Sequence, residues 1–265
     1  MPDYLSVCEE AARAGGAVLL ERWESFQFRE KAPKDLVTEA DVASQEAIRH
    51  VVLGHFPTHS FLAEEGADIR GSDARFRWIA DPLDGTANYV HRVPEFTVAV
   101  ALEQEGDLVA GVVFNPVSGE CFTAARGKGA HINGQPLRVS QVRELRSAMV
   151  AVSFAHGVQP GSVEIENFLN VLAASQSIRR TGSAALNLAY VAAGRYDAYW
   201  ATSTNPWDIA AGVLLVREAG GIVTGIDGGP LDLASAKFIA AANEPIHSAL
   251  RALVRDADDH GGARR

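Results

Sequence analysis

The spacing of hydrophobic residues predicts two helices at the start of the chain. Residues 4–25 are rich in alanine and place apolar side chains at helical intervals. Pro33 interrupts this pattern, and helical spacing returns from Val42 to Phe56, immediately before Pro57. We therefore expect one helix on each side of an irregular segment.

From Trp78 onward the pattern changes to short runs rich in β-branched and aromatic residues. Residues 96–116 form two such runs around Gly106, which predicts a hairpin. Residues 118–134 continue in the same way, with glycine at the expected turns. The first half of the chain is therefore expected to end in an antiparallel meander.

The second half alternates between strand-like and helix-like segments. We expect strands over residues 147–154, 196–201, 221–226 and 237–243, and helices over residues 162–175, 184–194, 206–221 and 245–257. Ser183 is placed to cap the second of these helices, while Pro206 and Gly220 mark the start and end of the third. The pattern predicts a mixed α/β and α+β fold whose halves, residues 1–145 and 146–265, pack closely together.

Composition and charge narrow the function classes. The chain is 47% hydrophobic and 22% charged, and no apolar run reaches the roughly 18 residues of a membrane span. The N-terminus does not resemble a signal peptide, and two cysteines, Cys8 and Cys121, do not make a disulfide framework. We therefore expect a cytoplasmic protein without a membrane partner. A net charge of -9 without a Lys/Arg cluster argues against a nucleic-acid partner.

Candidate chemistry begins at DPLDGT, residues 81–86, where two aspartates stand three apart after an apolar run. Pro82 keeps the backbone of Asp81 extended, and Gly85 permits a tight turn. The two carboxylates and the carbonyl of Leu83 can then converge on one point. Oxygen ligands of this kind suit Mg²⁺, Mn²⁺ or Ca²⁺, and the absence of His and Cys disfavours Zn²⁺.

Asp81 and Asp84 do not by themselves require a metal ion. Their spacing does not fit an EF-hand, whose twelfth position here is Arg92. The two aspartates can also cap the turn or pair with Arg77 and Arg92, and this alternative stays open on the hexapeptide alone.

Two further carboxylates add to the pair. Glu64 follows an apolar run and precedes Gly66, and Asp208 lies in the first turn of a helix, where the helix dipole alone favours a carboxylate. Four carboxylates at the ends of elements repel one another unless about two divalent cations lie between them. Such cations can clamp the attacking and leaving oxygens of a phosphoryl transfer and attract a phosphate to an acidic chain.

At these residues the chain resembles the inositol monophosphatase family, the Mg²⁺-dependent, lithium-sensitive phosphatases. The matching segments occur in the family's order: KAPKDLVTEAD, AEEG, WIADPLDGTANYVHRVPEF, RRTGSAALNLAYVAAGRYDAYW and PWDIAAGVLLVREAGG. They span residues 31–221, and the second half is especially similar to bacterial inositol-1-monophosphatases. The resemblance implies a layered αβαβα sandwich of the inositol monophosphatase/fructose bisphosphatase type, a homodimer, and two or three Mg²⁺ per active site.

The resemblance also implies roles for individual residues. The first metal would be held by Glu64, Asp81, Asp84 and the carbonyl of Leu83, and the second by Asp81, Asp84 and Asp208. Glu64 and Thr86 would activate the attacking water, and Asp41 would orient Thr86. The phosphate or the rest of the substrate would contact or lie near Gly85, Thr86, Lys31, Ser183 and Ala184.

Ala201 is where the chain departs from the family. Inositol-specific members carry a glutamate seven residues before the aspartate of the Trp-Asp pair, where it binds sugar hydroxyls, and Ala201 holds that substrate-binding position here. Residues 202–205 can hydrogen-bond hydroxyls but carry no charge. The implied function is hydrolysis of a small phosphorylated polyol, with inositol monophosphate first. Histidinol phosphate, fructose 1,6-bisphosphate and 3′-phosphoadenosine 5′-phosphate are the alternatives.

A second class of function is a dimeric binding or regulatory module that has kept the fold and lost turnover. Glu64 and Thr86 argue against it, because a scaffold does not need a water-activating pair. Arg179 and Arg180 are placed to reach the site or a dimer partner, or to remain solvated.

Overall fold

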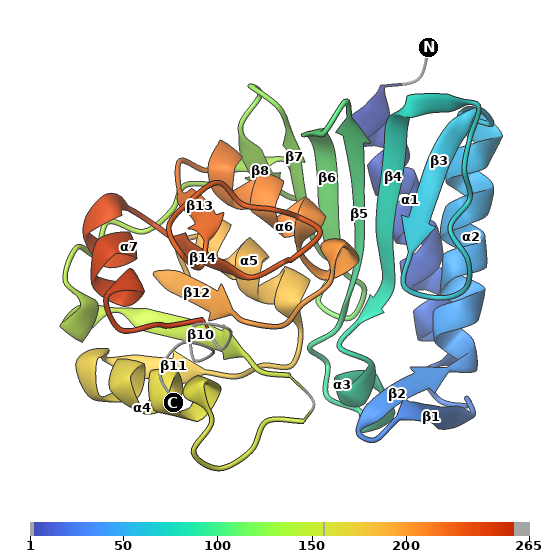
Figure 1. Ribbon diagram of the computed structural model, residues 1–265. Coiled ribbons are helices and arrows are strands. Elements are labelled where there is room, and N and C mark those ends of the chain that lie inside the picture. Colours follow the sequence, from blue (N-terminus) through green and yellow to red (C-terminus); the bar gives the residue numbers. More distant parts are fainter. Residues whose placement is uncertain (1–2, 156, 257–265) are drawn as a thin grey trace, which may run out of the picture.

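Residues 3–155 and 157–256 are described in the computed structural model (Figure 1). Within them the helices are α1 (Tyr4–Arg22), α2 (Glu39–His55), α3 (Thr86–Val90), α4 (Val163–Ala174), α5 (Ala184–Ala192), α6 (Pro206–Glu218) and α7 (Glu244–Arg251), with a 3₁₀ helix at Leu145–Ser147. In this part of the chain, no helix is both long enough and apolar enough to cross a membrane.

The first half of the chain builds a seven-stranded sheet in sequential order. Its strands are β3 (His59–Ala63), β4 (Asp73–Asp84), β5 (Thr97–Gln104), β6 (Asp107–Asn115), β7 (Glu120–Ala125), β8 (Ala130–Ile132) and β9 (Gln135–Pro136). β3 runs parallel to β4, and the other neighbouring pairs are antiparallel. The expected hairpin around Gly106 is β5–β6, so the predicted meander is confirmed.

The second half builds a five-stranded sheet in the order β11-β10-β12-β14-β13. Its strands are β10 (Met149–Ser153), β11 (Ser177–Arg179), β12 (Ala198–Ala201), β13 (Ile222–Gly225) and β14 (Phe238–Ala241). β10 runs parallel to both β11 and β12, while β14 runs antiparallel to β12 and β13. The sheet is therefore mixed, as expected of an α/β unit whose last strands turn back on themselves.

These elements form five layers (Figure 1). α1 and α2 cover the outer face of the seven-stranded sheet, α5 and α6 lie between the two sheets, and α4 and α7 cover the far face of the five-stranded sheet. The expected αβαβα sandwich is therefore confirmed. One apolar core joins α5 and α6 to residues of both sheets, so the second half of the chain completes the core of the first.

The structure corrects the expectations for the segment around Pro33. An exposed antiparallel hairpin, β1 (Phe28–Ala32) and β2 (Asp35–Thr38), replaces the irregular break. α2 begins at Glu39 instead of Val42, because the Thr38 side chain accepts hydrogen bonds from the first turn and the Asp41 carboxylate accepts one from the backbone N–H of Thr38. The closing helix also ends earlier than expected, at Arg251.

Candidate active site

A bulge in β4 places both aspartates of DPLDGT on one face of the sheet. Asp81 pairs with Ala99 and Asp84 with Thr97, so three steps along β4 face two steps along β5. Residues three apart in an unbroken strand point to opposite faces of the sheet. The extra residue of the bulge turns the side chain of Asp84 to the same face as that of Asp81. Both carboxylates are buried, with 2% and 7% of each residue exposed.

Gly85 turns the chain from β4 into α3. Its φ of +97° lies in the left-handed region, and a Cβ there would stand 3.1 Å from the carbonyl oxygen of Glu95. The turn leaves the Thr86 hydroxyl 3.2 Å from Asp41 Oδ1 and 3.1 Å from the Leu83 carbonyl oxygen. Asp41 is fully buried and held by the α2 cap, so it presents a fixed acceptor to Thr86.

The N-terminus of α5 binds the carboxylate of Asp84. The Ser183 hydroxyl donates to this carboxylate, as do the backbone N–H groups of Ala184 at 3.0 Å and Ala185 at 2.8 Å. Thr97 donates a further hydrogen bond at 3.3 Å. Hydrogen bonds to a charged acceptor at a helix N-terminus are among the stronger ones in proteins, so Asp84 links the two halves at the site.

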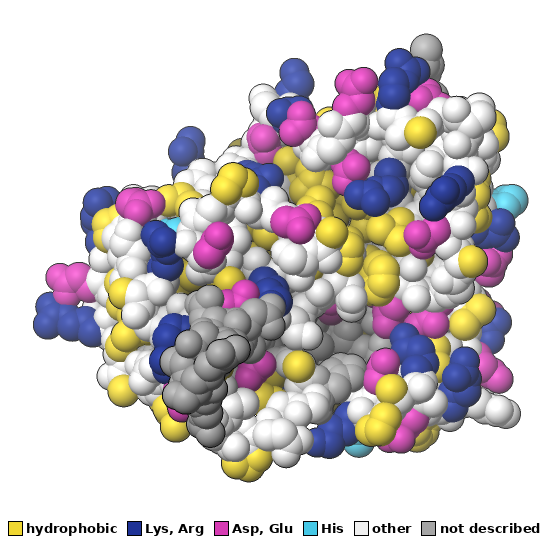
Figure 2. All heavy atoms as spheres, in the orientation of Figure 1, with side chains coloured by type: hydrophobic (Ala, Val, Ile, Leu, Met, Phe, Trp, Pro, Cys, Tyr) yellow, Lys and Arg dark blue, Asp and Glu magenta, His cyan; other side chains and the backbone are white. Residues whose placement is uncertain are grey.

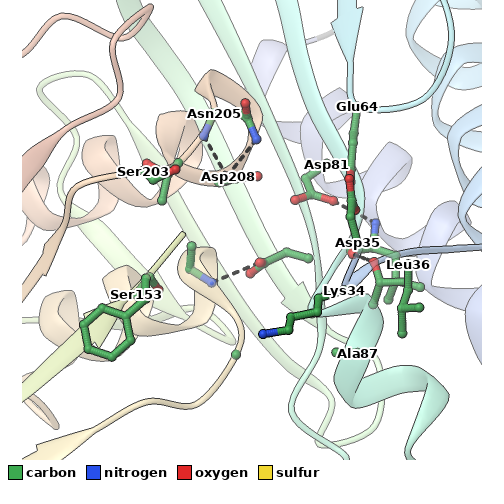
Figure 3. A pocket seen from close by; sticks show the side chains of 18 of the residues that line it. Lys34, Asp35, Leu36, Glu64, Asp81, Ala87, Ser153, Ser203, Asn205 and Asp208 are labelled. Carbon is green, nitrogen blue, oxygen red and sulfur yellow. Dashed lines mark hydrogen bonds between the residues drawn. The ribbon is translucent and has the colours of Figure 1, made fainter. Parts of the chain in front are cut away.

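Glu64 and Asp208 reach the same place from opposite halves. Glu64 follows β3, and its Oε1 lies 2.7 Å from the Nζ of Lys31, which lies equally close to Glu65. Asp208 lies in the first turn of α6 and accepts a hydrogen bond of 2.7 Å from the backbone N–H of Asn205. In Figure 3, Glu64 and Asp81 lie on the side of the seven-stranded sheet, and Asp208 lies on the helix that faces them.

The four carboxylates line one cleft of about 240 Å³ between the halves. Its other lining residues are Lys34, Asp35, Leu36, Leu83, Gly85, Thr86, Ala87, Ser153, Phe154, Arg180, Gly182, Ala184, Ser203, Thr204 and Asn205. Sequence reasoning did not place Lys34, Asp35, Leu36, Ser153 or Phe154 in the site. Each lies on a turn or strand end that only the tertiary structure brings to the cleft.

Burial and mutual repulsion disfavour the charged forms of these acids. Burial, with a smaller contribution from neighbouring carboxylates, raises the pKa of Glu64 to about 7 and that of Asp208 to about 7. Burial together with the charges of Glu64, Asp84 and Asp208 raises the pKa of Asp81 well above its ordinary value. Such a cluster of buried carboxylates carries uncompensated negative charge and attracts cations.

The ion-pair alternative for the two aspartates is contradicted. Arg77 lies 2.7 Å from Glu103 on the neighbouring strand. Arg92 stacks on Phe26 and donates to the carbonyl of Glu24. Neither arginine pairs with Asp81 or Asp84.

The donor set fits a hard divalent cation, because every charged group in it is a carboxylate and the Leu83 carbonyl stands beside them. Within the described ranges, no three acidic, imidazole or thiol groups already stand in the arrangement of a metal cage. Glu64 is paired with Lys31, and Asp84 is held by α5. Lys31 bonds to Glu64 through Oε1, so a cation that binds this oxygen must displace the ammonium.

Two expected substrate contacts need correction. Ser183 is fully buried beneath Asp84 and is absent from the cleft wall, because its hydroxyl is committed to that carboxylate and to the α5 cap. Ala201 is also fully buried, inside β12 between Ser153 and Phe238, so its methyl does not reach the cleft. Of the other expected contacts, Gly85, Thr86 and Ala184 line the cleft, whereas Lys31 bonds to Glu64 and does not line it.

The family model for the inositol monophosphatase family matches residues 2–259, almost the whole chain. The chain belongs to the inositol monophosphatase family. An inositol-1-monophosphatase of Rhizobium meliloti is 43% identical over 88% of this chain and 87% of its own length. The Nus factor SuhB of Escherichia coli K12 is 38% identical over 97% of both chains.

Solved structures of this family share the fold. The extragenic suppressor protein suhB of Bartonella henselae superposes with a TM-score of 0.90 at 41% identity, covering 94% of this chain and 96% of the other. An IMPase/NADP phosphatase complexed with Mg²⁺ and phosphate superposes with a TM-score of 0.80 at 28% identity, covering 90% of this chain and 89% of the other. A staphylococcal inositol monophosphatase-1 in a LiCl-soaked inhibitory complex superposes with a TM-score of 0.81 at 27% identity, covering 93% of this chain and 90% of the other.

Proposed function

We propose that the chain is a Mg²⁺-dependent phosphomonoesterase that hydrolyses small phosphorylated polyols, with inositol monophosphate as the leading substrate. The observation that carries this proposal is the cluster of Glu64, Asp81, Asp84 and Asp208 beside the Thr86–Asp41 pair. Relatives named inositol-1-monophosphatase, and a related structure holding Mg²⁺ and phosphate, support it.

Each group in the cleft has a role in this reaction. Bound Mg²⁺ would neutralise the carboxylates and supply Lewis-acid chemistry that lowers the pKa of the attacking water. Thr86 orients that water through its hydroxyl, which Asp41 holds in place, and Glu64 accepts its proton. The amides of Gly85 and Thr86, at the start of α3, would donate to the phosphate oxygens. The four carboxylates would hold the cations together with the Leu83 carbonyl.

The test is phosphate release with Mg²⁺ from inositol 1-phosphate, histidinol phosphate, fructose 1,6-bisphosphate and 3′-phosphoadenosine 5′-phosphate. The Asp84→Asn variant serves as the blank, with circular dichroism to show that it folds. We expect turnover of at least one ester by the native chain and a loss of about 10²-fold or more in the variant. Turnover that is equal in both proteins would contradict the proposal.

Relatives named Nus factor SuhB favour a second candidate, a regulatory module without turnover. That candidate predicts a folded protein that binds Mg²⁺ and releases no phosphate from any ester in the panel. For the phosphatase we also propose inhibition by Li⁺ at the Asp81–Asp84–Asp208 site, which the lithium complex of the staphylococcal relative supports.

We further propose a homodimer that works in the cytoplasm. The dimer is supported by Leu169 and Leu172, which are 54% and 47% exposed on α4, beside the edge strand β11. A cytoplasmic location is supported by Cys8 and Cys121, which are free, buried thiols. Sedimentation equilibrium tests the dimer directly.

A further inference from the structure

Charge is unevenly distributed within the cleft. In Figure 3, Ser153 and Ser203 lie across the cleft from Glu64 and Asp81. Ser203, Thr204 and Asn205 line this opposite side and carry no charge, and the carboxylate of Asp208 follows them on α6. Over the face shown in Figure 2, positive and negative side chains are mixed and do not gather by sign. Most carboxylates that line the cleft come from the first half of the chain, and Asp208 comes from the second.

Lys34 brings a positive charge into the cleft from the first half of the chain. It occupies the turn between β1 and β2 with φ +68°, and its side chain extends into the cleft toward the side of Ser153 (Figure 3). Lys31, on the same hairpin, is bound to Glu64 and Glu65. Lys34 has no hydrogen bond or ion pair with any residue that the structure describes.

Arg180 brings a second positive charge from the other half. It follows β11 and lines the same cleft, with its guanidinium carbon 5.7 Å from the centre of the Phe154 ring. Phe154 is itself packed edge-on against Phe168 of α4, so the ring forms a supported platform for the guanidinium. Across residues 3–155 and 157–256, no carboxylate pairs with Arg180.

We propose that Lys34 and Arg180 bind a second anionic group on the substrate, a phosphate or a carboxylate on the part that is not hydrolysed. The proposal rests on the phosphatase function proposed above. The carboxylate cluster and the amides of Gly85 and Thr86 account for the reacting phosphate in the same cleft. An ammonium and a guanidinium from opposite walls match one anion between them. Cationic alcohols such as histidinol are repelled there.

Matched pairs of esters test the proposal, because each pair differs by one anionic group. Fructose 1,6-bisphosphate is compared with fructose 1-phosphate, and 2-phosphoglycerate with glycerol 2-phosphate. We expect the native chain to prefer the doubly anionic ester by roughly tenfold or more in kcat/KM in at least one pair. The pair that shows the preference identifies the second group as phosphate or carboxylate.

Variants then assign the preference to residues. Lys34→Met and Arg180→Met keep an aliphatic stem and should each reduce the kcat/KM ratio within that pair by about tenfold. Lys128→Met, on the exposed turn between β7 and β8, should leave the ratio and both rates unchanged.

Two results would overturn the inference while leaving the phosphatase in place. One is equal kcat/KM within both pairs for the native chain. The other is an equal loss on both members of a pair in the variants, which would mean that these cations bind the reacting phosphate. If none of the four esters, nor any ester of the earlier panel, releases phosphate, it is the proposed phosphatase function that fails.

Discussion

At the scale of residues, the carboxylates that the proposed function needs in the cleft destabilise the metal-free fold. Glu64, Asp81 and Asp208 are held where burial and mutual repulsion oppose their charged forms. Among the described residues, Lys31 forms an ion pair with Glu64, and its Nζ lies 2.7 Å from both Glu64 and Glu65. Lys31 therefore competes with any cation that binds Glu64.

Lys31→Met should strengthen Mg²⁺ binding. Removing the ammonium frees Glu64 and adds one net negative charge to the cleft, so we expect the Kd to fall severalfold, equivalent to about 1 kcal/mol. Isothermal titration calorimetry measures this, with Lys128→Met as the charge-matched control. Weaker binding in Lys31→Met alone would mean that Lys31 positions Glu64 for the cation.

A histidine outside the cleft gives a test of pH dependence. Trp78 donates its indole N–H to Nδ1 of His59 at 3.1 Å, and Phe56 and Phe76 stack on the two sides of the imidazole. Burial lowers the pKa of His59, because the protonated ring would lose this hydrogen bond and its charge would lie among aromatic rings. The neutral ring is therefore the form that the fold favours.

The sign of the pH effect follows from linkage. With its folded pKa below the unfolded value near 6.5, His59 contributes stability above that value and loses it as the pH falls toward the folded pKa. His59→Gln removes this titration, so its free energy of unfolding should fall less than that of the native chain between pH 8 and pH 5. Urea unfolding at several pH values measures the two slopes. Identical slopes would show that His59 does not titrate in this range.

At the scale of elements, the regular segments with a buried face were predictable and the exposed ones were not. Two runs rich in β-branched residues around Gly106 predicted β5–β6, and the cap and breaker residues predicted α5 and α6. β1 is exposed at all five positions, so its pairing with β2 leaves no hydrophobic pattern to detect. The α2 start was missed because a side-chain cap outweighed the hydrophobic spacing.

The same limit applies to the candidate site. The carboxylates were recognised because they lie at the ends of predicted elements and because the resemblance to the family assigns them to metal sites. The commitment of Ser183 to Asp84 and the burial of Ala201 depend on how two distant halves meet. No local pattern records such contacts.

The α2 cap links local structure to the proposed chemistry. Thr38→Ala removes the hydroxyl that caps α2 and holds Asp41, and we expect a loss of about 1 kcal/mol in the free energy of unfolding. We also expect a lower kcat, because Asp41 no longer holds Thr86 in one orientation. Thr38→Ser keeps the hydroxyl and should retain most of the free energy of unfolding and most of the kcat. A normal kcat in a destabilised Thr38→Ala would contradict the link between the cap and Thr86.

At the scale of the whole molecule, the site exists only where the two halves meet. α5 and α6 pack against the seven-stranded sheet. The first turn of α5 carries the groups that donate hydrogen bonds to Asp84, and the first turn of α6 carries the carboxylate of Asp208. Because the folded-state pKa values of Glu64 and Asp208 lie above their ordinary values near 4, the metal-free fold loses stability as the pH rises toward 7.

Asp208→Asn should therefore be more stable than the native chain in EDTA at pH 7.5. We expect a gain of about 1 kcal/mol from the lost repulsion, together with a much smaller increase in Tm on adding Mg²⁺. Thermal unfolding with EDTA and with Mg²⁺ measures both effects. A variant that is less stable in EDTA, yet responds fully to Mg²⁺, would place the cations away from Asp208.

The most direct test of the account is where a divalent cation binds. Crystals soaked in Mn²⁺ and measured near the manganese absorption edge show its position by anomalous scattering. We predict peaks coordinated by Glu64, Asp81, Asp84 and Asp208. Peaks elsewhere, or no peak in a protein that still hydrolyses phosphate esters, would contradict the central role of the carboxylate cluster.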